Sequence, residues 1–145
     1  MSTYTERFTE VSQYLGGINP ASYNSVQDTG YVSFANFHRG VVIVHAGVLG
    51  QNVDFDFEEA TSTAGAGAQS FDSAGKDFLL TATTDNNTVS VVEIKSEEFD
   101  VDNNYDCLNV ECTPAGSSSI FSLQIWGLVP RFAPVSTTGL DSVTD

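Results

Sequence analysis

The segment Asp100–Glu111, DVDNNYDCLNVE, places oxygen-bearing side chains at relative positions 1, 3, 5, 7 and 12, which is the ligand spacing of a calcium-binding EF-hand loop. An EF-hand also needs glycine at its sixth position and a helix on each side. Here Tyr105 occupies that position, and the flanking segments have the composition of strands. We therefore expect Asp102-Asn103-Asn104 to form a hairpin turn, since Asn and Asp tolerate left-handed dihedrals. An adventitious calcium or magnesium site is the alternative.

Carboxylates alternate with apolar side chains in NVDFDFEEA. In a strand, this alternation puts Asp54, Asp56 and Glu58 on one face and Val53, Phe55 and Phe57 on the other. Carboxylate pairs that hydrolyse glycosides must face each other across a bound sugar, with their pKa values held apart. A row along one strand does not supply that geometry. We expect a solvated outer face, with an interface to a basic partner surface as the alternative.

Other motifs for catalysis or cofactor binding are incomplete. His38 and His45 are too few for a zinc site unless carboxylates complete it, and His45 is expected in the core or an interface. AGSSSI lacks the G-x-S-x-G pattern of a nucleophile elbow, and GAGAQS lacks the third glycine of a dinucleotide fingerprint. The sequence thus predicts no catalytic residue, no cofactor, no metal ligand and no enzymatic activity.

The composition favours one acidic β domain. The chain has 145 residues, which suits a single domain over 1–145, and 11% of them are aromatic. Nineteen acidic and five basic residues give a net charge of −14, so nucleic acid and anionic membranes are poor partners. Cys107 and Cys112 are five residues apart and would face opposite sides of one strand, which predicts free thiols.

The segment from residue 30 to 129 alternates with period two and forms the expected β-sandwich core. Its strand candidates are YVSFANF, GVVIVHAGV, NVDFDFEEA, FLLTATT, TVSVVEIKS, CLNVECT and IFSLQIWGLV. This spacing predicts an all-β fold, an antiparallel β-sandwich or jelly roll. The run from Gly40 to Val48 is apolar at nearly every position. It is either a central strand covered on both faces or a strand that contacts another subunit.

The two ends of the chain are expected to form a short helix and extended arms. Thr3 and Glu6 form a capping box, and Tyr4, Phe8, Val11 and Leu15 follow at helical spacing before Gly16-Gly17. An irregular arm would complete the segment 1–29. The C-terminal arm, 130–145, contains two prolines that disfavour a central strand. The N-terminus shows no basic leader with an apolar run, and no stretch is long enough to span a membrane, so we expect a soluble protein without an export signal.

Three stretches, LGGINPASYNS, TGYVSFANFHRGVVIV and GLVPRFAPVSTTGLD, resemble small virion proteins of tailed bacteriophages that are assigned as head decoration or capsid cement proteins. The resemblance spans most of the chain. It implies a non-enzymatic β-sandwich or jelly-roll protein on the outer surface of the capsid, bound to the major capsid protein, commonly as a homotrimer. Assembly in the host cytoplasm is also implied.

A capsid-binding role would rest on apolar side chains of the arms, with arginines as polar anchors. The candidate interface residues are Tyr4, Phe8, Leu15, Arg39, Arg131, Phe132, Val135 and Leu140. A tail or head-tail connector component is the first alternative. A carbohydrate-binding module is the second, with Trp126, Tyr31 or Tyr105 as exposed stacking platforms.

Overall fold

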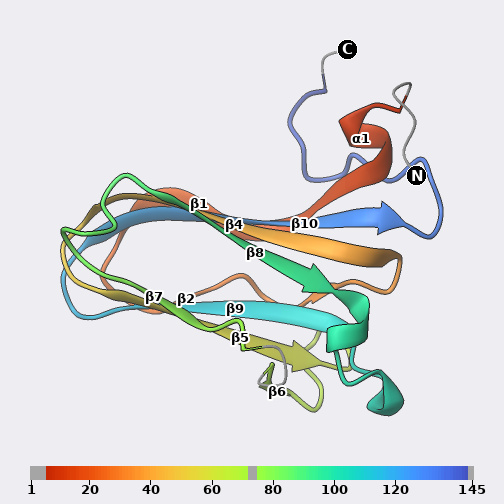
Figure 1. Cartoon of the computed structure of the whole chain (residues 1–145), viewed down its shortest axis with the longest axis horizontal. Coiled ribbons are helices and arrows are strands. Elements are labelled where there is room, and N and C mark those ends of the chain that lie inside the picture. Colours follow the sequence, from red (N-terminus) through yellow and green to blue (C-terminus); the bar gives the residue numbers. More distant parts are fainter. Residues whose placement is uncertain (1–5, 72–74, 144–145) are drawn as a thin grey trace.

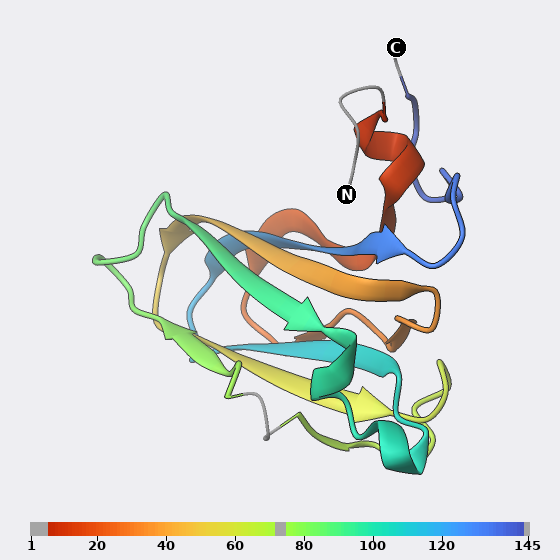
Figure 2. The same ribbon diagram turned by 45° about the vertical axis from the view of Figure 1, so that its right-hand side comes forward.

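The computed structural model describes residues 6–71 and 75–143, which form two antiparallel sheets packed face to face (Figure 1; Figure 2). The sheet drawn uppermost in Figure 1, here called the upper sheet, has the order β1 (Ser12–Tyr23), β10 (Ser119–Pro130), β4 (Phe37–Leu49) and β8 (Val89–Lys95). The lower sheet has the order β2 (Gln27–Asp28), β9 (Cys107–Pro114), β5 (Val53–Ala60) and β6 (Gln69–Ser70). Two short strands extend it, β3 (Val32–Ser33) on β9 and β7 (Phe78–Leu80) on β5.

The strand order defines a jelly roll. With β2 and β3 counted as one position, and β6 and β7 as another, the upper sheet contains the first, eighth, third and sixth positions of the chain. The lower sheet contains the second, seventh, fourth and fifth. This interleaving of two Greek keys is the jelly-roll arrangement. The all-β sandwich or jelly-roll prediction is confirmed.

Side-chain alternation in the long strands builds the core. Val42 and Val44 of β4 face Phe55 and Phe57 of β5 across the gap between the sheets, and all four are buried. Phe55 stacks on Phe78 with ring centroids 4.7 Å apart. Each apolar side chain of this size contributes about 1.5 to 3 kcal/mol when fully buried. The sandwich interior is therefore filled by side chains rather than open as a binding cavity.

The N-terminal helix is much shorter than expected, and the predicted arm after it is wrong. Helix α1 covers Phe8–Val11, and β1 begins at Ser12 and pairs with β10 as far as Tyr23. An isolated helix of this length is marginal in water, whereas pairing with β10 satisfies the main chain. Gly17 does not stop a helix; a Cβ there would lie 2.1 Å from the Leu123 carbonyl oxygen, so it permits close strand contact.

The C-terminal segment has no regular structure after Pro130 in the described residues, but it lies on its own sandwich. It turns back over the upper sheet toward α1, as Figure 1 shows. The Val135 amide donates to the Glu10 carbonyl at 3.2 Å, and the Val135 side chain packs against the core. Gly139 lies against the Tyr14 ring. Val135 and Leu140 are thus half-buried against their own chain, while the other described residues after Pro130 are exposed.

The predicted hairpin at residues 102–104 is a turn of a different kind. Two short 3-10 turns, Ser96–Glu98 and Val101–Asn103, connect β8 of the upper sheet to β9 of the lower sheet. Asn104 is left-handed, with φ of 64°, as expected for Asn in a turn. The segment therefore crosses between sheets instead of joining neighbouring strands.

Candidate functional site

A row of carboxylates crosses the outer face of the lower sheet. Asp28 of β2 is paired with Glu111 of β9, and Glu111 is paired with Asp56 of β5. Asp54 and Glu58 flank Asp56 on the same face. The alternation in β5 predicted its three carboxylates, but not Asp28 or Glu111, because these join the row only through pairing between strands distant in sequence.

Part of this acidic face is held by a buried amide. Asn109 is 4% exposed, and its Nδ2 donates to Asp28 Oδ1 at 3.2 Å and to Glu58 Oε2 at 3.1 Å. The Tyr31 hydroxyl donates to the same Glu58 oxygen at 2.7 Å, and Thr29 Oγ1 donates to Asn109 Oδ1 at 3.1 Å. Burial and the Glu58 carboxylate raise the pKa of Tyr31 to about 12. These bonds fix one end of the row.

The centre of the row carries unfavourable electrostatics. Burial raises the pKa of Asp56, and repulsion from Asp54, Asp77 and Glu58 adds to the effect. Burial likewise raises the pKa of Glu111, with further contributions from Asp28, Glu58 and Asp56. Within residues 6–71 and 75–143, no group of three or more His, Cys, Asp or Glu residues is placed to hold a metal ion. The carboxylates repel one another without forming an acid and base pair across a cleft.

The outer face of the upper sheet carries few charges. The charged side chains of its strands are Arg39, Glu93 and Lys95, a net charge of +1. The strands of the lower sheet contain acidic side chains and no basic ones, a net charge of −6 from Asp28, Asp54, Asp56, Glu58, Glu59 and Glu111. Of these, Glu59 is buried and does not contribute to the outer face. The molecule therefore has one acidic face and one face that is nearly neutral and partly apolar.

The apolar candidate interface residues do not share one environment. Phe132 is 77% exposed and Phe8 is also exposed, so both are available to a partner. Leu15 and Val135 pack against the core of their own chain, which makes them structural residues, and Tyr4 lies outside the described residues. Leu140 is half-buried beside a groove that it shares with Tyr14 and Trp126.

The two candidate arginines differ in their surroundings. Arg39 is exposed on the outer face of β4, opposite Lys95 of β8. Arg131 holds the turn after β10, because its Nε donates to the Ala35 carbonyl at 3.0 Å and its amide donates to the Asn36 carbonyl at 2.8 Å. Arg131 therefore positions the neighbouring Phe132.

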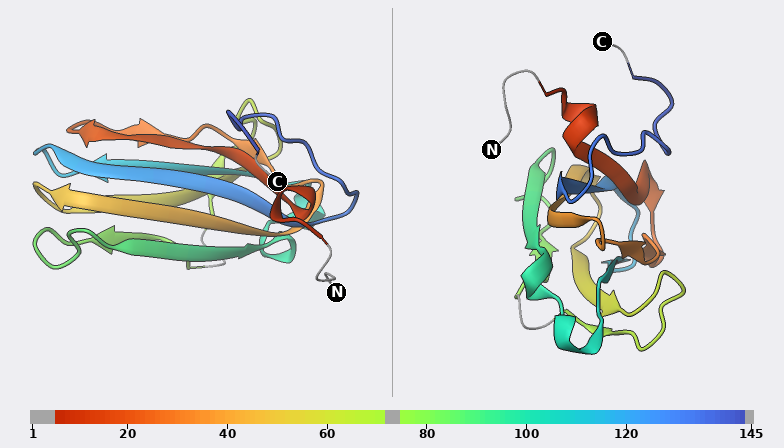
Figure 3. Two further views of the ribbon diagram at one scale, coloured as in Figure 1. Left: turned by 90° about the horizontal axis from the view of Figure 1, so that it is seen from above. Right: turned by 90° about the vertical axis from the view of Figure 1, so that its right-hand side faces the viewer.

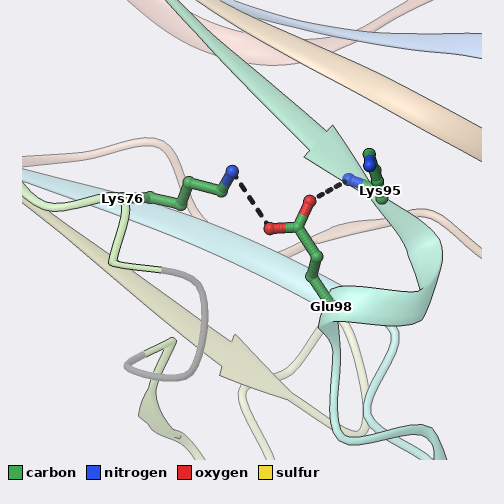
Figure 4. Close-up of polar contacts among 3 residues, drawn as sticks. All are labelled: Lys76, Lys95 and Glu98. Carbon is green, nitrogen blue, oxygen red and sulfur yellow. Dashed lines mark hydrogen bonds and ion pairs between the residues drawn. The ribbon is translucent and has the colours of Figure 1, made fainter.

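A hollow of about 640 Å³ lies at one end of the sandwich. It contains Glu59, which is 4% exposed and accepts hydrogen bonds from Gln69 Nε2 at 2.7 Å and from the Asp100 amide at 3.0 Å. Glu98, also in the hollow, pairs with Lys76 at 3.0 Å and accepts from the Lys95 amide at 2.8 Å (Figure 4). These carboxylates are engaged in structural bonds.

The environments of a histidine, the two cysteines and the tryptophan argue against a role in chemistry or sugar binding. His45 is exposed on the outer face of β4, between Ser122 and Val89, so it does not lie in the core, and its place in an interface stays a prediction. Cys107 and Cys112 are free and buried, as predicted. The Trp126 ring contacts Phe8 and Tyr14, with centroids 5.1 and 5.6 Å away, and it is half-buried. It is a poor platform for stacking a sugar.

The fold defines a β jelly-roll domain. No protein-family model matches the chain, and no curated protein matches it. Among solved structures, the coat protein of Tobacco streak virus in its C2 crystal form is similar at 7% identity and a TM-score of 0.39, over 97% of this chain and 100% of that chain. The Tobacco streak virus coat protein dimer is similar at 8% identity and a TM-score of 0.38, over 96% of this chain and 99% of that chain.

Naturally occurring empty particles of Cowpea mosaic virus give 7% identity and a TM-score of 0.38, over 92% of this chain and 91% of that chain. At these values the likeness supports no statement about function.

Within the described residues, no helix is long and apolar enough to cross a bilayer.

Proposed function

We propose that this protein is a structural virion protein that binds the outside of a bacteriophage capsid, as a homotrimer, and stabilises the shell through contacts between subunits. The observation that carries the proposal is the contrast between the two outer faces of the sandwich, one acidic and one nearly neutral with exposed apolar side chains. The resemblance of three segments to phage virion proteins supports it. The jelly roll is also a fold of viral capsid domains, although lectin domains and cupins share it.

In this proposal the protein stabilises the shell through non-covalent contacts between subunits. Phe132 and Phe8 are exposed on the side of the molecule that carries α1 and the C-terminal segment. Burying one such side chain contributes about 1.5 to 3 kcal/mol, and the contribution repeats at every copy on the shell. Arg39 is a candidate polar anchor beside this surface. The acidic lower face would point to solvent, since it repels nucleic acid.

The sandwich gives less support to the other functions of its fold. Cupins and many lectins use an open cavity or an exposed ring, whereas here Phe55, Phe57 and Phe121 fill the interior and Trp126 is half-buried. A tail or connector component remains the alternative within the virion. The number of copies per particle separates the two: hundreds indicate the shell, and a dozen or fewer indicate the connector or tail.

The decisive experiment is binding of purified protein to empty heads of a tailed bacteriophage, measured by co-sedimentation. Phe132→Ser should reduce binding without changing the melting temperature, because the ring is 77% exposed. Val26→Ser is the matched control, since Val26 is 49% exposed on the connection between β1 and β2. Deleting residues 1–20 is unsuitable because it removes most of β1. If wild-type protein fails to sediment with heads, the proposal is wrong.

A further inference from the structure

An apolar patch on the outer face of the upper sheet is left uncovered by the described chain. Ile43 of β4 is paired with Val91 of β8, and the neighbouring pairs on the same face are His45 with Val89 and Val41 with Glu93. Val89 and Val91 are 58% and 57% exposed, while Val41 and Ile43 are half-buried. We call Val41, Ile43, Val89 and Val91 the β4–β8 patch.

In the described part of the chain, only the other half of this sheet is covered. The Phe8 and Tyr14 rings contact Trp126 on β10, and the C-terminal segment lies against Tyr14 at Gly139. Figure 3 (left) looks down on the sheet, with α1 and the C-terminal segment over its right-hand end and β4 and β8 running along one side. β8 is an edge strand that pairs with β4 alone, and an open edge favours contact with another chain.

The charge distribution indicates that the partner at the β4–β8 patch is another copy of this chain. Two copies of a chain with a net charge of −14 repel each other over most of their surface. The upper sheet, with its net charge of +1, is where this repulsion is smallest. Glu93 lies beside the patch, and Arg39 and Lys95 are paired next to it, so Glu93 of one copy can meet Arg39 or Lys95 of another. A basic partner would instead be drawn to the lower sheet.

We propose that copies of this chain associate through the β4–β8 patch, with Val91 close to the symmetry axis of the assembly. A residue near such an axis meets its own equivalent in a twofold or a threefold arrangement. The inference rests on the proposed function, which requires copies to associate, and it names the surface that joins them. Contacts with the shell would then be left to Phe132 and its neighbours.

Disulfide trapping tests the position of Val91. The native thiols, Cys107 and Cys112, are buried, so a cysteine placed at an exposed site is the reactive one. Val91→Cys should give a disulfide-linked pair of chains under mild oxidation. Asp54→Cys is the matched control because Asp54 is exposed on the opposite outer face, and it should stay unlinked. Equal linking of the two variants, or none at Val91→Cys, overturns the inference.

Sedimentation velocity of purified protein gives an independent test. Val91→Lys should convert the assembly to monomers, whereas Val101→Lys, with 58% exposure on the connection between the sheets, should sediment like wild type. Both should melt like wild type, since neither side chain is in the core. A monomeric wild type, or a Val91→Lys variant that stays assembled, overturns the inference. Protein that coats heads yet is monomeric refutes the patch and the homotrimer but not binding to the capsid. Protein that assembles through the patch yet does not bind heads refutes only the virion role.

Discussion

Asp56 and Glu111 are directly opposed on β5 and β9, with both side chains half-buried on the outer face of the lower sheet. Asp28 extends the pair to β2. Like charges placed opposite each other on neighbouring strands are destabilising. This pairing is therefore expected to lower the stability of the protein, and the size of the effect can be measured.

Neutralising this pair should stabilise the protein at neutral pH. Asp56→Asn combined with Glu111→Gln should raise the free energy of unfolding by about 0.5 kcal/mol, the usual scale for a cross-strand pair. Urea unfolding at neutral pH provides the measurement. Asp102→Asn, which removes an exposed carboxylate from the connection between the sheets, is the control and should have a smaller effect. A destabilised double variant would show that the two carboxylates are not in conflict.

The same pair predicts a pH dependence. Both carboxyls have pKa values raised above their ordinary values of 3.8 and 4.5 in the folded protein, so the folded state holds more protons than the unfolded state between the ordinary and the raised pKa. Their contribution to stability thus falls as pH rises through that window. The advantage of the double variant over wild type should shrink as the pH is lowered toward 4.5 and 3.8. An advantage that is constant with pH would contradict this.

Removing the Asn109 amide should destabilise the lower sheet. Asn109→Ala leaves Asp28 and Glu58 without their shared donor. It also removes one of the two acceptors within reach of Thr29 Oγ1, the other being the Gly30 carbonyl at 2.9 Å. Loss of a buried polar partner costs about 1 to 3 kcal/mol. Chemical denaturation measures the change, and Asn103→Ala is the control, because Asn103 makes an exposed hydrogen bond to Asp100. If Asn109→Ala and Asn103→Ala lower the free energy of unfolding equally, the hydrogen-bond network around Asn109 does not stabilise the protein.

Adding a methyl group at Gly17 should strain the contact between β1 and β10. The Cβ of Gly17→Ala would meet the Leu123 carbonyl oxygen at 2.1 Å, and backbone atoms cannot move aside as a side chain can. Overpacking of this kind costs about 1 to 3 kcal/mol. Gly16→Ala is the comparison, since its Cβ would meet the flexible Val32 side chain at 3.0 Å. The melting temperature should fall further for Gly17→Ala than for Gly16→Ala.

The two thiols should be unreactive in the folded protein. Burial and the Asp106 carboxylate raise the pKa of Cys107 to about 12, and burial raises the pKa of Cys112 as well. Thiolates are the reactive form. A thiol reagent such as Ellman's reagent should label neither cysteine in native protein at neutral pH and both in denaturant. Rapid labelling of native protein would contradict the burial of these residues.

The long central strands could be predicted from the sequence because their pattern is local. Alternation in the segments around β5, β8, β9 and β10 predicted each strand to within a few residues. β1 was missed because Phe8, Val11 and Leu15 also fit helical spacing, and its pairing partner lies about a hundred residues away. Local preference is weak compared with such tertiary pairing.

The surfaces were only partly predictable for the same reason. The carboxylates of β5 were assigned correctly to one face, but Asp28 and Glu111 join them through strands whose order a pattern cannot give. The apolar run from Gly40 to Val48 left two possibilities open. Its strand is central, with Val42 and Val44 in the core and Val41 and Ile43 on the outer face.

The position of β10 between β1 and β4 has a consequence for synthesis of the chain. While a ribosome is still making β10, the first strand has no neighbour to pair with and β4 lacks one of its two. The nascent upper sheet is a two-stranded ribbon until that gap is filled, with apolar edges open to chaperones or to other unfinished chains. Contacts between such distant segments form slowly, so we expect the chain to be prone to aggregation until β10 takes its place.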